Sequence, residues 1–145
     1  MNTLECREAA RQRLEHLRLK EHPDCFVCGQ GKGGLGLRFE LRSDSSVEAT
    51  FDCIDFFQGY SCILHGGIIS SMLDAAMTHC LFAQGEVAFT AELVIQFKRP
   101  VSTRQSATIS ARMQHDYCPL FVMQAELVQN GFLAASATGK FMRRE

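Results

Sequence analysis

Residues 63–82 read ILHGGIISSMLDAAMTHCLF, and this stretch decides the fold. Its residues are nearly all apolar or small and do not alternate as in a half-buried strand, so its length predicts a helix that is buried on most sides. Asp74 is the only Asp, Glu, Lys or Arg between Phe56 and Gly85. Because a buried carboxylate without partners is costly, we expect compensating groups around Asp74. A structural Asp would find them in the hydroxyl groups one helical turn away, those of Ser70, Ser71 and Thr78.

Runs with a period of two lie on both sides of this helix. Before it, the alternation predicts strands over 35–42 and 47–53, joined through the turn-rich residues 43–46 as a hairpin. After it come four further strands, and Asn130-Gly131 between the last two is typical of a type I′ turn. In the first of the four, the residues expected to face the core are Phe89, Ala91, Leu93, Ile95 and Phe97. The order β-β-α-β-β-β-β favours an α+β fold in which an antiparallel sheet wraps around the central helix.

The N-terminal part of the chain has a different pattern. Residues 4–20 combine a few leucines with opposite charges at three- and four-residue spacing, which predicts a surface helix. We expect residues 1–22 to form an N-terminal helical extension and residues 23–145 to form a single domain. Five glycines within residues 22–36 predict a long loop between the two.

The composition is that of an ordinary soluble globular protein. The chain has 145 residues, a net charge of -1, 46% hydrophobic and 21% charged residues, and these values disfavour a nucleic-acid partner. We expect no membrane association and no secretory signal, because no apolar stretch is long enough and the N-terminus alternates acid and base. The seven cysteines, an odd number, then indicate free thiols in a cytoplasmic location.

The motif His65-Gly66-Gly67 opens the central helix. Two glycines at this position would let a substrate approach backbone N–H groups that lack an intrahelical partner and lie at the positive end of the helix dipole. The motif is therefore a candidate oxyanion site. The structural alternative is a tight turn into the helix, with His65 hydrogen-bonded to the backbone.

The stretch HGGIISSMLDAAM at residues 65–77, followed by TAELVIQFKRPV at residues 90–101, resembles the PaaI-type hotdog-fold acyl-CoA thioesterases of the hydroxybenzoyl-CoA thioesterase-like superfamily. The resemblance covers about residues 33–142. It implies a single hotdog thioesterase domain, homodimers that often pair into homotetramers, and hydrolysis of an acyl-CoA thioester. It implies no metal and no other cofactor, the CoA thioester being the substrate.

Catalytic roles are carried over from this resemblance by position. Gly66, with Gly67 beside it, is similar to the residue whose N–H polarises the thioester carbonyl. Asp74 is similar to the catalytic carboxylate, which acts as a general base or as a nucleophile. Thr90 matches a hydroxyl that orients water or the carboxylate, and Thr78, one helical turn after Asp74, is the alternative.

The remaining candidates lie around this centre. Gln58 lies where many family members have an Asn or Gln upstream of the glycine motif. If the ligand is coenzyme A, its phosphates need cationic partners, and Lys98, Arg99 and Arg104 are the candidates. His65 completes the expected substrate-binding set. The structural alternative for the three basic residues is ordinary solvated surface.

The spacing of the two central residues implies a shared site. Gly66 and Asp74 are eight positions apart, so a helix separates them by roughly 12 Å, too far for both to touch one thioester group. If both act on the same substrate, a second copy of the chain must supply one of them. We therefore expect the site at a subunit interface.

The segment Cys25-Phe26-Val27-Cys28 is the second motif of interest. A CxxC is half of a zinc site or a redox pair, and His22 is a possible third zinc ligand, but no second CxxC follows and no helix begins there. We expect no metal, with Cys25 and Phe26 as small and large hydrophobic residues in a loop that caps the sheet. Two rival functions stay open: a non-hydrolytic acyl-CoA or acyl-ligand binding protein, and a zinc or redox role of this loop.

Overall fold

The computed structural model describes residues 2–29, 31 and 33–145. Within these residues, two α-helices, one short 3-10 helix and six strands follow one another: α1 (Thr3–Glu21), β1 (Glu40–Leu41), β2 (Val47–Asp52), η1 (Asp55–Phe57), α2 (Gly66–Ala83), β3 (Ala88–Phe97), β4 (Ser106–Tyr117), β5 (Leu120–Gln129) and β6 (Phe132–Arg143). The strands form one antiparallel sheet in the order β1-β2-β4-β5-β6-β3. In the described part of the chain, neither helix has the length and hydropathy needed to cross a lipid bilayer.

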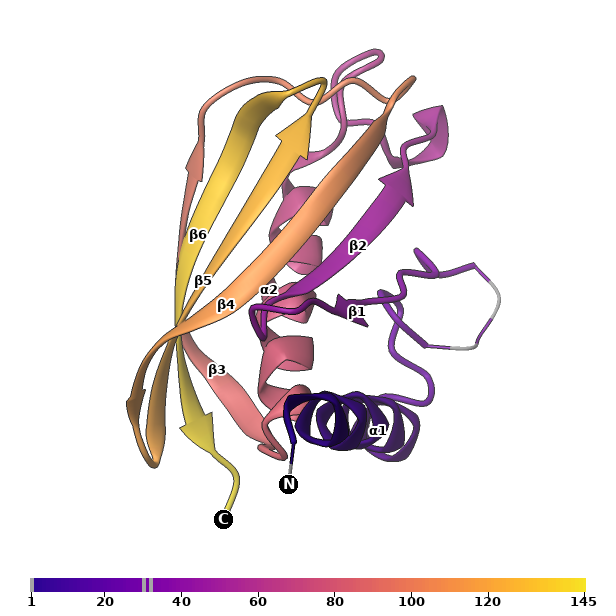
Figure 1. Ribbon diagram of the computed structural model, residues 1–145. Coiled ribbons are helices and arrows are strands. Elements are labelled where there is room, and N and C mark those ends of the chain that lie inside the picture. The colour runs from indigo at the N-terminus through magenta and orange to yellow at the C-terminus, as the bar shows by residue number, and fades with distance from the viewer. Residues whose placement is uncertain (1, 30, 32) are drawn as a thin grey trace.

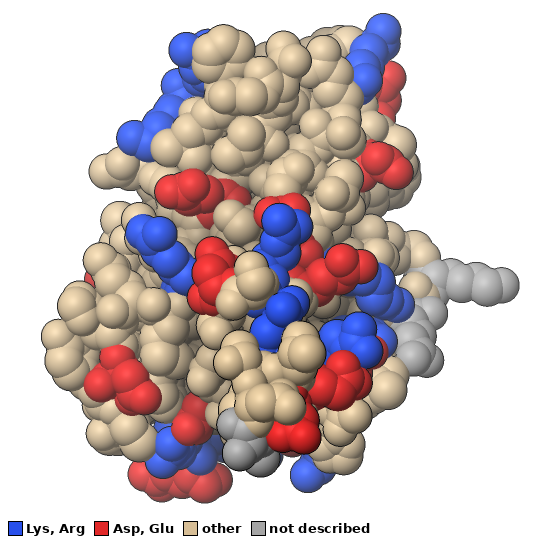
Figure 2. Space-filling view, viewed as in Figure 1, with Lys and Arg blue, Asp and Glu red and all other residues tan. Residues whose placement is uncertain are grey.

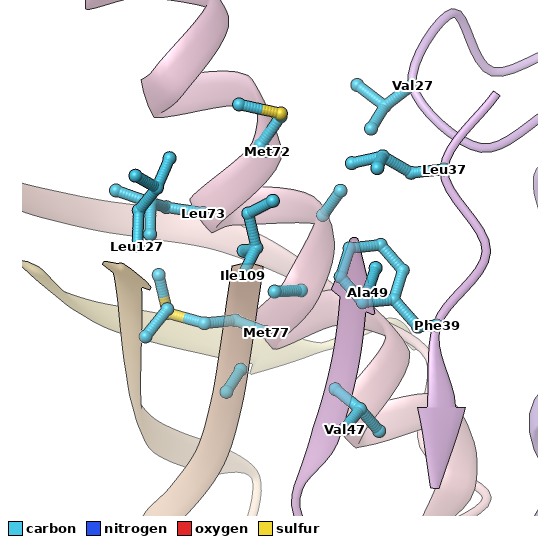
Figure 3. Close-up of a cluster of buried hydrophobic side chains, with 14 of the residues drawn as sticks. Val27, Leu37, Phe39, Val47, Ala49, Met72, Leu73, Met77, Ile109 and Leu127 are labelled. Carbon is cyan, nitrogen blue, oxygen red and sulfur yellow. The ribbon is translucent and has the colours of Figure 1, made fainter. Parts of the chain in front are cut away.

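The sheet curves around α2, as Figure 1 shows. Met72, Leu73 and Met77 on this helix are fully buried and lie toward Ile109 of β4 and Leu127 of β5 (Figure 3). Because α2 is apolar on most sides, this one helix supplies the centre of the core to most of the strands. The expected α+β class, an antiparallel sheet wrapped around a central helix with a further N-terminal helix, is confirmed.

Helix α1 lies across one end of α2 (Figure 1). Its first turn is closed by a capping box, in which Asn2 and Glu5 accept hydrogen bonds from each other's backbone N–H. Leu14 is only 1% exposed and belongs to the main core. Helix α1 carries interspersed acidic and basic side chains, and blue and red side chains alternate over the centre and lower right of the face shown in Figure 2.

The first predicted hairpin is only partly formed. Leu37 and Phe39 are buried as the alternation predicts, but the ladder of β1 is limited to Glu40–Leu41. The reason is that the backbone before β1 pairs elsewhere: the N–H of Leu35 donates to the carbonyl of Phe26, and that of Leu37 to the carbonyl of Val27. The second hairpin is confirmed, with Asn130 and Gly131 both at positive φ.

Strand β3 forms an open edge of the sheet. The expectation that all its odd-numbered apolar residues face the core is wrong. The register with β6 shifts between Thr90 and Glu92, which leaves Ala91 in a bulge and reverses the sides to which its neighbours point. As a result Phe89, before the bulge, is 64% exposed. Phe97, at the end of the strand, is also exposed, at 56%, while Leu93 and Ile95 pack against the core as expected.

Candidate active site

Asp74 and Thr90 are brought together by α2 and β3. The Thr90 hydroxyl donates to Oδ1 of Asp74 over 2.7 Å. Thr90 reaches the helix because the bulge at Ala91 turns it to the helix side of the strand, whereas simple alternation places it on the polar face. Thr78 does not contact the carboxylate, since its hydroxyl donates to the backbone carbonyl of Asp74.

The surroundings of Asp74 differ from those of a structural aspartate. The hydroxyl groups of Ser70 and Ser71 donate to the carbonyls of Gly66 and Gly67, one turn back, and not to the Asp74 carboxylate. The expectation of a deeply buried carboxylate is also wrong. Asp74 is half-buried, and its carboxylate lies beside Thr90 of the edge strand β3.

The residues of the His65-Gly66-Gly67 motif have different roles in the first turn of α2. His65 is the N-cap, and its Nδ1 accepts a hydrogen bond of 2.8 Å from the N–H of Gly67. The carbonyl of His65 accepts from the N–H groups of Ile68 and Ile69. Within the described residues, the N–H of Gly66 has no partner, so Gly66 rather than Gly67 offers a free donor at the positive end of this helix.

Glycine is favoured at Gly67 for a steric reason. A Cβ atom there would lie 3.0 Å from Nδ1 of His65, so a larger residue would require the capping ring to shift by a few tenths of an ångström. A Cβ atom at Gly66 would meet only the Phe97 ring, at an ordinary contact distance of 3.6 Å. The absence of a side chain at Gly66 therefore leaves open space beside its N–H.

An open pocket of about 400 Å³ lies beside Gly66. Its walls are mainly apolar and come from the start of α2 and the end of β3, and two basic residues, Lys98 and Arg99, line it. Arg104 is held elsewhere by an ion pair of 3.5 Å with Asp55. Gln58 lies in the turn that precedes α2, where its side-chain oxygen accepts from the N–H of Cys62.

The candidate residues thus form two groups. Gly66, Lys98 and Arg99 lie together at the start of α2, and Asp74 and Thr90 lie together further along the helix. Asp74 does not line the pocket beside Gly66. Helix rise puts the two groups roughly 12 Å apart within one chain.

The loop after α1 brings together His22, Cys25 and Cys28, the three possible zinc ligands named from the sequence. Ligand atoms of His22, Cys25 and Cys28 all lie within 4.8 Å of one another. The expected role of Phe26 as a capping hydrophobic residue is wrong, because Phe26 is exposed while Val27 and Cys28 are buried. Burial, followed by the influence of Cys25, raises the pKa of the Cys28 thiol to about 12, unlike the lowered pKa of redox-active CxxC thiols.

Comparison with known proteins connects this geometry to a family. The family model described as Thioesterase superfamily matches residues 63–130, which include α2 with its glycine motif and Asp74. Over these residues the chain is similar to the thioesterase superfamily. The PaaI protein from the phenylacetic acid degradation operon of E. coli has the same fold, with a TM-score of 0.81 and 21% identity over 97% of this chain and 96% of that one. The resemblance to PaaI-type proteins and the hotdog fold are both confirmed.

Two further proteins are similar to this chain. The acyl-coenzyme A thioesterase THEM4 of Bos taurus is 30% identical over 115 residues, which cover 76% of this chain and 47% of that protein. The chain thus spans less than half the length of this curated relative. A protein of Streptococcus pneumoniae described as a hypothetical thioesterase, solved with coenzyme A, has a TM-score of 0.69 and 19% identity over 74% of this chain and 87% of that one.

Proposed function

We propose that this protein is an acyl-CoA thioesterase, which hydrolyses a CoA thioester to the free acid and CoA. The observation that carries the proposal is the Thr90–Asp74 hydrogen bond. This bond fixes the orientation of Asp74, which is the one acidic residue of α2 and is half-buried. A hydrolase needs such a carboxylate, whereas a protein that only binds acyl groups has no evident use for it.

The reaction needs three events at the thioester. The N–H of Gly66 would donate to the carbonyl oxygen and stabilise the negative charge that develops on it. Asp74 would take a proton from water as that water attacks the carbonyl carbon, or would itself attack and form an anhydride that water then cleaves. In both cases the C–S bond breaks, and the CoA sulfur leaves as a thiolate that is then protonated. These steps use groups of the protein alone.

We further propose that two copies of the chain complete each site by pairing their β3 edges. The exposed Phe89, Val94 and Phe97 on an open edge strand support a second copy as the partner, because such an edge otherwise favours aggregation. Thr90 lies near the start of β3, and Phe97, which contacts the position of Gly66, lies at its end.

Two-fold symmetry in such a pair would bring together the two groups of candidate residues, which lie roughly 12 Å apart within one chain. If two β3 strands pair antiparallel around Leu93 and Val94, the end of one strand lies beside the start of the other. The pocket at Gly66 of one protomer would then face Asp74 of its partner. A homodimer is the smallest unit with complete sites, and a homotetramer made of two such dimers would keep them.

The binding of coenzyme A is assigned to the pocket beside Gly66. Lys98 and Arg99 would contact its phosphates, and the CoA-bound relative supports a ligand of this class. Arg104 is the weaker candidate of the three because it is paired with Asp55. All seven cysteines are free thiols, which supports the proposal of a cytoplasmic, reducing location.

A panel of acyl-CoA substrates tests the proposed function. The homo-oligomer is incubated with aliphatic and aromatic acyl-CoAs, and the release of free CoA thiol is followed. We expect saturable turnover with at least one acyl class. Saturable binding of acyl-CoA without thiol release across the whole panel would instead establish the non-hydrolytic binding protein.

Thr90 and Thr78 both lie near Asp74, but only Thr90 bonds the carboxylate, and this difference gives a prediction. We expect Thr90→Ala to lower kcat by roughly ten-fold, because the Asp74 carboxylate loses a hydrogen bond that orients it. Thr78→Ala should have a smaller effect, since Thr78 bonds only a backbone carbonyl. Steady-state kinetics on both variants provides the measurement, and a larger loss for Thr78→Ala would contradict the assignment.

A further inference from the structure

A cluster of potential metal ligands lies where α1 ends. His22 is the C-cap residue of α1, and Cys25 and Cys28 follow it at intervals of three residues. The three side chains converge, with Cys28 Sγ 3.6 Å from Nδ1 of His22. This cluster is not among the residues that the proposed hydrolysis uses.

The backbone around the two cysteines is folded tightly. The N–H of Gly29 donates to the carbonyl of Cys25 over 2.7 Å. A Cβ atom at Gly29 would lie 2.5 Å from that same oxygen, so only glycine permits the turn that brings the two thiols together. The cysteines are therefore placed by a specific turn and not by a flexible loop.

Contacts with neighbouring segments fix this turn in place. Arg18 of α1 and Arg38 both donate to the carbonyl of Cys28, over 3.3 and 2.6 Å. Val27, between the cysteines, is buried and lies beside Leu37 (Figure 3). Hydrogen bonds around metal ligands orient those ligands before the ion binds. The contacts of Arg18 and Arg38 hold the Cys28 backbone in place in a similar way.

His79 on α2 supplies an independent indication of a ligand. Its ring is fully buried, and its Nδ1 lies 2.7 Å from the carbonyl of Ala75. A carbonyl only accepts, so Nδ1 carries the proton and Nε2 offers a lone pair. Within the described residues, Nε2 of His79 is a buried side-chain nitrogen without a hydrogen-bond partner. A metal-bound histidine typically has this arrangement, with one nitrogen fixed by a carbonyl and the other free.

The rings of His22 and His79 are neighbours. Their centres lie 6.3 Å apart, at an interplanar angle of 88°. Two imidazoles on one tetrahedral zinc ion have ring centres about 5 Å apart, given Zn–N distances of about 2.0–2.1 Å. His79 is not in the group whose ligand atoms all lie within 4.8 Å of one another, so the two rings would have to close by about 1 Å for His79 to join the other three around a metal ion.

We propose that His22, Cys25, Cys28 and His79 bind one zinc-class divalent cation. Two thiolates and two imidazoles form a donor set typical of structural zinc sites, and soft sulfur ligands select against magnesium and calcium. Binding would release the two thiol protons to solvent. The ion would join the end of α1, the following loop and α2, so its role is to stabilise the N-terminal part of the fold.

Cobalt(II) is the probe for this site, because its spectrum reports both geometry and sulfur ligation. The reduced, metal-free full chain is titrated with cobalt and then with zinc. We expect a single equivalent to bind, with the intense visible bands of tetrahedral cobalt and a sulfur-to-cobalt charge-transfer band that zinc abolishes. Zinc should also raise the Tm of the wild-type protein.

Variants connect the spectrum to the residues. Cys25→Ser, Cys28→Ser and His22→Gln should each lower zinc affinity by more than about 100-fold, since loss of an outer-shell partner alone costs about 10- to 100-fold. Cys118→Ser, at an exposed position in the β4–β5 turn, is the matched control and should bind as the wild type does.

Three results would overturn the proposal. One is cobalt binding without the charge-transfer band, and another is equal zinc affinity in Cys28→Ser and Cys118→Ser. The third is a Cys25–Cys28 disulfide in the purified protein together with no metal uptake after reduction. Unchanged affinity in His79→Gln would remove His79 from the ligand set. Circular dichroism of each metal-free variant, compared with the metal-free wild type, verifies that the fold is retained.

Discussion

Asp74→Asn is expected to lower kcat for acyl-CoA hydrolysis by about 10²–10⁴-fold while the protein remains folded. The amide has the same shape as the carboxylate and can still accept the hydrogen bond of Thr90, so the packing of α2 is preserved. It can neither take a proton from water nor attack the carbonyl carbon. Thiol-release kinetics measures the loss.

Asp52→Asn serves as the matched control for this substitution. Asp52 is an exposed residue on β2, and the same change in charge should leave kcat within about two-fold of the wild type. KM for the acyl-CoA is expected to change little in Asp74→Asn, because the proposed phosphate contacts are made at Lys98 and Arg99. Near-normal turnover by folded Asp74→Asn would remove Asp74 from the mechanism.

Mixing two inactive variants is expected to restore activity. Asp74→Asn is one parent, and Gly66→Val, whose added methyl groups fill the space beside the N–H of Gly66, is the other. A Cβ atom at Gly66 makes only an ordinary contact with Phe97, so we expect this variant to fold. A mixed dimer contains one site with both defects and one with neither, so its activity should approach about half that of the wild-type dimer.

The outcome depends on whether each site spans two chains. If a single chain carried the whole site, every site in the mixture would keep one defect and no activity would return. Mass spectrometry of the co-refolded sample verifies that mixed dimers are present. Each parent refolded alone, at the same total concentration, gives the baseline. A mixture no more active than its parents would contradict the proposed β3 pairing but not the hotdog fold.

Much of the fold follows from local patterns. The apolar run that forms α2 and the Asn130-Gly131 turn depend on contacts between residues close in sequence, and both are found as predicted. The hydrolytic candidates Asp74 and Gly66 stand out for a similar reason. A single charge in an apolar helix and a glycine pair at its start are visible without tertiary information.

The rest depends on contacts that periodicity does not contain. The bulge at Ala91 arises from pairing between β3 and β6, which lie far apart in sequence, and so the side to which Thr90 points could not be read from alternation. The choice of Gly66 over Gly67 as donor depends on the direction of the His65 ring. In the sequence, His79 is not distinguished from the other buried residues of α2. Its unpartnered Nε2 and its neighbour His22 become visible only in the structure.

The bulge at Ala91 makes the register of β3 a functional quantity. Thr90 pairs with Phe141 and Glu92 with Lys140, so deleting Ala91 would make the pairing continuous and leave Thr90 on the helix side. Loss of the bulge with every residue kept would instead shift the preceding segment by one position, which turns Thr90 to solvent and Phe89 against α2. The hydrogen bond to Asp74 therefore depends on where the extra residue is accommodated and not on the side chain at Ala91. Substitution or deletion of Ala91 should leave that bond in place, whereas a one-residue slip of the segment before it should break it.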